Sequence, residues 1–133
     1  MSLNEQSTSQ PYLLGRLFAV LERAQRDALG DNINATIKDR YFTSACASPA
    51  SVFPVLLRLS QHHIAKATYG YVSDQRIENI LNKLDVENNP FPAHLSLDEQ
   101  GIFVLGYYHQ RNAFFHKKVA AEDTAAGEEP VQP

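Results

Sequence analysis

Apolar residues recur at helical spacing along almost the whole chain. Between residues 11 and 29 they return every three or four positions, so they form one stripe along a predicted helix. Gly30 follows directly, where a left-handed C-terminal cap favours glycine. The charged side chains of this segment lie mostly off the stripe: Arg16, Arg23, Arg26 and Asp27.

Two further helices are predicted in the next part of the chain. A short helix runs from about Ala35 to Ala47, and Asn32 or Asn34 can supply its N-terminal cap. A third helix starts at Ser48-Pro49 or at Ser51, because either serine can cap it and proline is tolerated in a first turn. We expect Gly70 to end this third helix.

The last two predicted helices are separated by a proline-rich loop. Ser73 or Asp74 caps the fourth helix, and residues 88–92 form the loop because two prolines disfavour helical geometry there. Ser96 and Glu99 then match a capping box, which starts a fifth helix that ends at residue 115 or 116.

These elements predict an all-α fold, a compact bundle of about five helices with short connections. Residues 1–10 are polar and are expected to be a flexible N-terminus. Residues 11–118 form the bundle. Residues 119–133 are rich in Ala, Glu, Gly and Pro, a composition typical of a disordered acidic tail.

Length and composition fit one soluble domain. A chain of 133 residues can bury a real core, and no apolar run approaches the roughly 20 residues of a membrane span. The N-terminal residues lack the basic-then-apolar order of a signal peptide. Cys46 is the single cysteine, so no intrachain disulfide can form and a reducing cytoplasm is the expected compartment.

The charges are distributed unevenly. The net charge is −3, yet all 12 basic residues lie between Arg16 and Lys118. The same stretch contains ten acidic residues, so its net charge is +2. Residues 40–73 contain no Asp or Glu. The mildly basic body and acidic tail do not suggest a freestanding high-affinity DNA-binding protein. They fit a protein that touches nucleic acid as one member of an assembly.

The acid-free window supplies the candidate binding residues. Arg58, His62 and Lys66 follow one another at four-residue steps on one helix face. Cations without nearby acids attract phosphate by salt-sensitive forces and read no sequence. An ordinary solvated surface is the alternative interpretation. The candidate residues for binding a nucleic-acid backbone are Lys38, Arg40, Arg58, His62, Lys66 and Arg111.

The pattern gives little support to catalysis or to a metal site. Adjacent His62 and His63 point about 100° apart on a helix, which is poor geometry for one ion. Cys46 has no activating residue nearby in the sequence and resembles a buried small apolar residue. We therefore predict no catalytic residue, no metal ligand and no cofactor.

Aromatic residues gather in the fifth predicted helix. Tyr107 and Tyr108 are adjacent, so the cluster wraps around the helix and part of it must be exposed. We expect a subunit contact at these two tyrosines. Gly101 and Gly106 lie inside the helical pattern, where small residues most often allow close helix packing.

Several sequence blocks, in the same order, resemble a known family. The chain is similar to the C-terminal region of the large subunit of type I-C CRISPR Cascade complexes over about residues 12–111. The blocks that carry this resemblance are LGRLFAVLE at 14–22, INATIKDRYF at 33–42, ASVFP at 50–54, LRLSQHH at 57–63, FPAHLSL at 91–97, QG at 100–101 and GYYHQ at 106–110.

The resemblance implies a role in an assembly. In that family a short, separately translated product of the large-subunit gene is the Cascade small subunit, and a chain that starts at Met1 resembles it. The implied fold is an all-helical bundle, present in more than one copy along the guide-RNA filament. The implied partners are the large subunit, the filament subunits, the guide RNA and the target DNA, whose displaced non-target strand it helps to hold in the R-loop. No membrane partner and no catalytic residue are implied.

Two alternatives remain. The chain can be a purely structural module that bridges neighbouring subunits without touching nucleic acid. It can also be a small cysteine-dependent or metal-dependent enzyme, in which case Cys46→Ala or a chelator would abolish its function. The acidic tail lies outside the resemblance.

Overall fold

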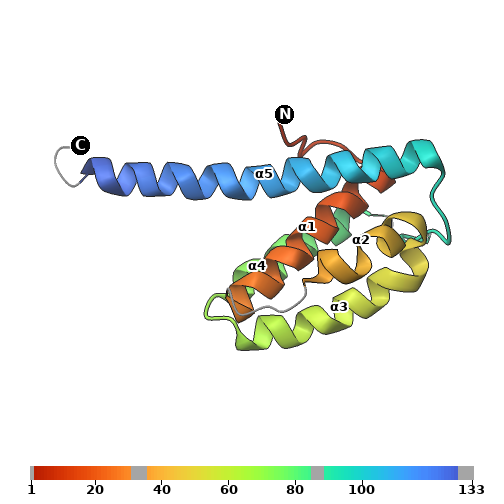
Figure 1. Cartoon of the computed structure of the whole chain (residues 1–133), viewed down its shortest axis with the longest axis horizontal. Coiled ribbons are helices and arrows are strands. Elements are labelled where there is room, and N and C mark those ends of the chain that lie inside the picture. Colours follow the sequence, from red (N-terminus) through yellow and green to blue (C-terminus); the bar gives the residue numbers. More distant parts are fainter. Residues whose placement is uncertain (1, 31–35, 85–88, 129–133) are drawn as a thin grey trace.

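The computed structural model describes residues 2–30, 36–84 and 89–128, with side chains described as far as Phe115. Within these residues the structure contains five helices and no strand, so the predicted all-α bundle is confirmed (Figure 1). The helices are α1 (Gln10–Leu29), α2 (Ile37–Ala47), α3 (Pro49–Lys66), α4 (Gly70–Lys83) and α5 (Leu97–Glu128).

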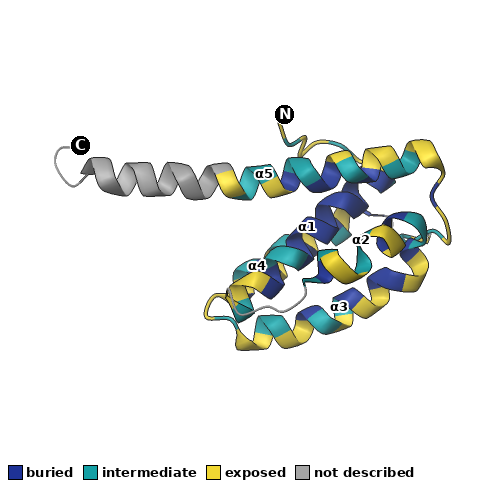
Figure 2. Cartoon of the chain, viewed as in Figure 1, coloured by how far each residue is buried: buried dark blue, intermediate teal, exposed yellow. Residues whose placement is uncertain are grey.

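Helix α1 lies at the centre of the bundle. It packs most extensively against α5 and also contacts α2, α3 and α4. Every residue from Pro11 to Leu21 is buried, so burial covers more of this helix than the single predicted stripe (Figure 2). Arg16 was expected mostly off the stripe but is buried, because α1 is covered from several sides and not only from one.

Two glycines bring the backbones of α1 and α5 together. A Cβ atom on Gly15 would collide with the backbone of Phe103 and Tyr107, and one on Gly106 would collide with the carbonyl of Tyr12. Because only glycine lacks a Cβ, these positions allow the closest approach of the two helices. The predicted packing role is therefore confirmed for Gly106. It is wrong for Gly101, which is exposed and has open space around it.

Aromatic rings fill the centre of the core. Phe18 of α1 makes edge-to-face contacts with rings from α2, α3 and α5, at centroid distances of 5.3–6.4 Å. Such geometry places the positive edge of one ring against the negative face of another. The rings that surround Phe18 are Phe42, Phe53, Phe103 and Tyr107.

The helix ends confirm some predicted caps and correct others. Gly30 caps α1 with a φ of 67°, and Ser96 and Glu99 form the predicted capping box, with hydrogen bonds of 2.8 and 3.1 Å. Helix α2 begins later than predicted, because Thr36 and Asp39 form a capping box of their own. The two asparagines proposed as its cap, Asn32 and Asn34, lie outside the described residues.

Helix α4 begins earlier than predicted. Its first residue is Gly70, whereas the sequence pattern placed the cap at Ser73 or Asp74. A Cβ atom on Gly70 would collide with the backbone of Ile64, so glycine is required where α4 turns back against α3. The expectation that Gly70 ends the third helix is wrong, because α3 already ends at Lys66 with Ala67 as its C-cap, and Gly70 instead starts α4.

Near both ends of the chain, the described residues are more ordered than the sequence predicted. Residues 2–9 precede α1 and contact the bundle: the backbone N–H of Asn4 donates to the Tyr12 hydroxyl at 2.9 Å, and Lys83 donates to the carbonyl of Glu5. Helix α5 continues past the predicted end at residue 115 or 116 to Glu128. The predicted tail, 119–133, falls on residues whose side chains or whole placement lie outside the described part.

Candidate functional site

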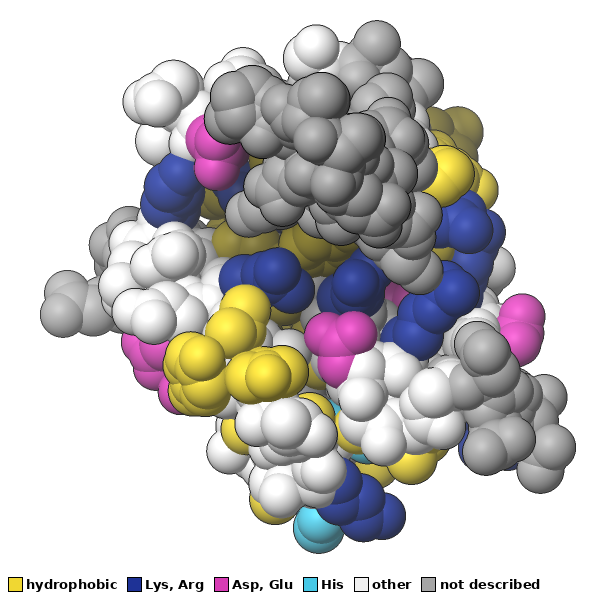
Figure 3. All heavy atoms as spheres, turned by 90° about the vertical axis from the view of Figure 1, so that its left-hand side faces the viewer, with side chains coloured by type: hydrophobic (Ala, Val, Ile, Leu, Met, Phe, Trp, Pro, Cys, Tyr) yellow, Lys and Arg dark blue, Asp and Glu magenta, His cyan; other side chains and the backbone are white. Residues whose placement is uncertain are grey.

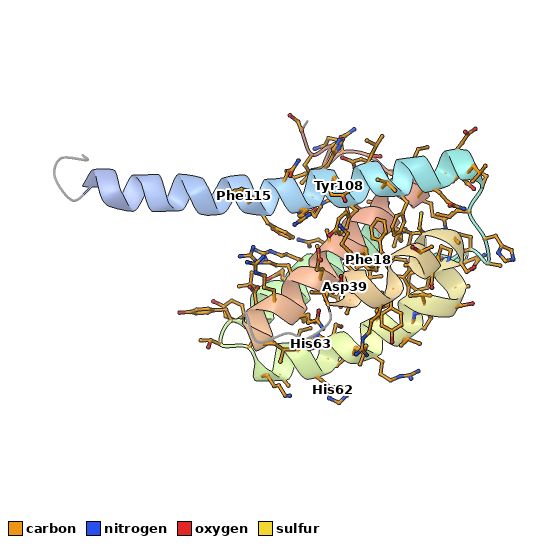
Figure 4. The ribbon with its side chains drawn as sticks, in the orientation of Figure 1. Phe18, Asp39, His62, His63, Tyr108 and Phe115 are labelled. Carbon is orange, nitrogen blue, oxygen red and sulfur yellow. The ribbon has the colours of Figure 1, made fainter. Side chains whose placement is uncertain are left out.

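The predicted basic row lies on the outer face of α3. Arg58, His62 and Lys66 are all exposed, and Figure 4 shows His62 pointing away from the bundle. Among the described residues, the structure gives none of these three an ion pair. The exposed positions between Ala50 and Lys66 carry no acid. The row is therefore a solvated cationic strip with no internal counter-charge.

His63, next to this row, points the other way. It is half-buried, and Figure 4 shows it directed inward from α3. Burial lowers the pKa of His63, and the positive charge of Lys66 and the neighbouring His62 lower this pKa further. The folded protein therefore favours the neutral imidazole at this position.

Acidification is expected to destabilise the bundle through His63. In the unfolded chain a histidine binds its proton near pH 6.5, but in the folded protein the lowered pKa delays protonation. The unfolded state then binds more protons, so stability is lost as the pH falls below about 6.5 towards the folded pKa. Chemical denaturation at pH 7.5, 6.5 and 5.5 measures this loss. His63→Gln should reduce the pH dependence, whereas the exposed control His62→Gln should keep most of it; equal slopes in the two variants would contradict the assignment.

Lys38 is engaged inside the protein. Its ammonium lies 5.2–5.7 Å from the centroids of the Phe42, Tyr107 and Tyr108 rings and donates a hydrogen bond of 3.2 Å to the Tyr108 hydroxyl. Cation–π attraction of this kind is strengthened when the charge is partly desolvated. Lys38 therefore ties α2 to α5, and its charge is less available to an outside phosphate than those of the α3 row.

Arg40 and Arg111 are exposed but do not extend the α3 row in sequence. Arg40 lies on α2, and Arg111 lies on α5, where its charge acts on Tyr107. Arg111 and Lys38 thus both lie near Tyr107, on the side of the bundle where α2 meets α5. The structure thus places three of the six predicted residues in a row on α3 and two, Lys38 and Arg111, near Tyr107, whereas Arg40 stands apart on α2.

The predicted subunit contact at Tyr107 is wrong, because Tyr107 is buried in the core. Its side chain is 0% exposed, and its hydroxyl donates a 2.5 Å hydrogen bond to Glu22 on α1. Burial raises the pKa of Tyr107, and the hydrogen bond to Glu22 raises it further, so the hydroxyl keeps its proton and remains a donor. A buried ring cannot meet a partner while the bundle is folded. Tyr108 is half-buried and keeps an accessible edge.

Cys46 is also buried. Its thiol lies 3.7 Å from the carbonyl oxygen of Gln100, and burial raises the pKa of Cys46, which favours the unreactive thiol over the thiolate. Within the part of the chain that the structure describes, no three His, Cys, Asp or Glu side chains lie close enough to hold a metal ion. Over the same residues, no helix is long and apolar enough to cross a membrane.

A second basic cluster was not predicted from the sequence. The guanidinium carbons of Arg76 and Arg23 lie 4.8 and 5.5 Å from the ring centroid of Phe114, and Asp27 pairs with Arg23 at 3.1 Å. Figure 3 shows Lys and Arg side chains gathered on the end of the molecule that carries the α3–α4 connection. These residues come from three helices, so no spacing within one segment signals them.

The comparisons with known proteins give one family. Residues 1–115 match the family model described as CRISPR-associated protein (Cas_Csd1). This match spans the region, 12–111, over which the sequence resembles a CRISPR Cascade subunit, and it confirms that resemblance at the level of the family. No curated protein matches the chain.

Proposed function

This chain belongs to the Csd1 family of CRISPR-associated proteins, and on that premise we propose that it acts as a non-catalytic small subunit of a type I-C Cascade complex. In this role it supports the R-loop by sequence-independent contacts to nucleic-acid backbone. Its partners are the large subunit, the filament subunits, guide RNA, target DNA and further copies of itself, in a prokaryotic cytoplasm. The match to a family of CRISPR-associated proteins supports membership of such an assembly.

One observation carries the nucleic-acid part of the proposal. Arg58, His62 and Lys66 form an exposed row on α3, and no acid lies in the surrounding window of residues 40–73. Arg58 and Lys66 lie about 12 Å apart along α3 with His62 between them, so the two cations can contact separate phosphates of one strand. The row therefore suits a phosphate backbone and carries no group arranged to read bases.

The test removes two charges from this row. Arg58→Gln combined with Lys66→Gln, in the assembled complex, should weaken R-loop formation about tenfold at low salt. Removing each phosphate interaction should also flatten the dependence of log affinity on log salt by about 0.7–0.9. The deficit should therefore shrink as salt rises. Binding of labelled target DNA across a salt series measures both effects.

The matched control removes one arginine and one lysine elsewhere. Arg26 on α1 and Lys83 on α4 are exposed and lie off the α3 row, and Arg26→Gln with Lys83→Gln changes the net charge by the same amount. A glutamine amide at position 83 keeps a donor for the Glu5 carbonyl that Lys83 contacts. This control should keep affinity and salt slope close to those of the parent. If the two double variants bind target DNA equally well in intact complexes, the α3 row does not contact nucleic acid.

A purely structural role is the second candidate. It is favoured by the exposed apolar side chains on the outer face of α5: Leu97, Ile102 and Leu105 are 83%, 37% and 48% exposed. Surface side chains of this kind suit a contact with another subunit. Under this alternative the α3 double variant would be absent from the purified complex, whereas under the proposed function it stays in the complex and binds DNA weakly.

A further inference from the structure

A cleft that no residue of α3 lines combines arginines and amides. It has a volume of about 290 Å³ and lies between α1, α4, α5 and the segment that precedes α1. The polar side chains that line it come from all four of these elements: Glu5, Arg16, Arg76, Asn79 and Gln110, beside the ring of Phe114.

Arg16 lies at the base of this cleft with an unused donor. Its side chain is only 7% exposed, and its Nε donates a 2.9 Å hydrogen bond to Oε1 of Gln110. Its Nη1 atom is buried and has no hydrogen-bond partner among the described residues. A buried guanidinium carries five donors and is stable only when acceptors meet them. An acceptor that reaches this guanidinium through the cleft would complete its hydrogen bonding once the side chains that cover Nη1 move aside.

The charges around the cleft are unbalanced. Arg16 and Arg76 both line it, whereas Glu5 is the one acid among its described lining residues. Glu5 acts on Arg16 through its charge, but no ion pair joins the two. Arg23 adds a further positive charge near Arg76, partly offset by Asp27. Three guanidiniums, those of Arg16, Arg23 and Arg76, therefore stand against the two carboxylates of Glu5 and Asp27, and this excess of positive charge favours an incoming anion.

We propose that this cleft binds a phosphate group of a nucleic-acid strand between the guanidiniums of Arg16 and Arg76. Gln110 uses its oxygen to accept from Arg16, so its NH₂ group remains a donor, and Asn79 offers a second amide at the lip. Donors from three helices thus line one cleft, and a guanidinium fork can bind a phosphate bidentately. The cleft volume lies near the lower end of the range of small-ligand pockets, roughly 300–1,000 Å³. This site goes beyond the proposed function, since it does not involve the α3 row.

The test titrates the full chain with a thymidine dinucleotide, which carries one phosphodiester, at constant ionic strength. The NMR signals of the Arg16 Nε–H and the Gln110 side-chain amide should shift and saturate. Asn79→Asp places a negative charge at the lip and should weaken this binding at least fivefold. Asn82→Asp is the matched control, because Asn82 is also exposed on α4 but does not line the cleft; it should bind as the parent does.

Further arms separate the possible outcomes. Glu5→Gln removes the competing carboxylate and should tighten binding severalfold. Glutarate, a dicarboxylate, should bind more weakly than the dinucleotide; tighter glutarate binding would assign the cleft to an acidic protein segment and overturn the proposal. Absence of a saturable shift, or equal weakening by both asparagine variants, would also overturn it. The Arg58→Gln/Lys66→Gln variant should bind the dinucleotide in the cleft as the parent does. The cleft and the α3 row are therefore tested independently, and the failure of one proposal does not decide the other.

Discussion

Replacing Tyr107 by alanine is expected to lower the free energy of unfolding by about 4 kcal/mol, because the large-to-small change empties a fully buried site. The ring contacts Phe18, Phe42 and Tyr108, so its loss removes packing from three helices at once. It also removes the donor that serves Glu22. Urea denaturation followed by far-UV circular dichroism measures the change.

Tyr108→Ala is the comparison that separates core from surface. Tyr108 is only half-buried, and its hydroxyl accepts a hydrogen bond from Lys38. Because the Tyr108 ring fills less of the core, Tyr108→Ala should lower the free energy of unfolding by only about 1 kcal/mol. Tyr107→Phe keeps the ring but leaves Glu22 without its donor, and should cost about 1–3 kcal/mol. If Tyr107→Ala and Tyr108→Ala destabilise the protein equally, Tyr107 is not in the core.

The second large effect is expected at Gly106. Gly106→Ala places a methyl group against the backbone carbonyl of Tyr12, which cannot move aside as a flexible side chain can. The methyl group must push α1 and α5 apart, and these two helices form the most extensive helix–helix contact in the bundle. Overpacking of this kind should lower the free energy of unfolding by about 3 kcal/mol, the upper end of its usual range. Thermal unfolding should shift down by about 10 °C for a chain of this size.

Gly101→Ala provides the control on the same helix. Gly101 is exposed, and no atom lies within 4 Å of the position that its Cβ would take. The substitution should therefore stabilise the protein by about 0.5–1 kcal/mol, because alanine favours helix over glycine. The two Gly→Ala changes in α5 should have opposite signs. A loss of stability at Gly101 as large as that at Gly106 would show that helix contact is not the cause.

The features that were predicted correctly depend on residues close together in the chain. Helix spacing, the Ser96–Glu99 capping box and the exposed row Arg58, His62 and Lys66 all follow from neighbours within about four positions. The start of α2 was missed because several residues of capping type lie between Asp31 and Asp39, and propensity does not rank Asn34 above Thr36.

The features that were missed depend on what packs against a helix. Tyr107 and Tyr108 are adjacent residues of the same type, and only the position of α1 decides which of them is buried. Arg16 is charged, as surface residues usually are, yet α5 and the segment before α1 cover it. The cleft assembles arginines that are far apart in sequence, so local patterns contain no sign that they meet.

The glycine contact between α1 and α5 also affects the order in which the bundle forms. The partners that meet across it are distant in the chain: Arg16 and Gln110 are 94 positions apart, and Tyr12 and His109 are 97 apart. Closing such long loops is slow, and the central helix stays without its main partner until α5 has been synthesised. During synthesis, α1 to α4 are therefore made before the partner that covers the buried helix α1. The core closes only when α5 has emerged from the ribosome.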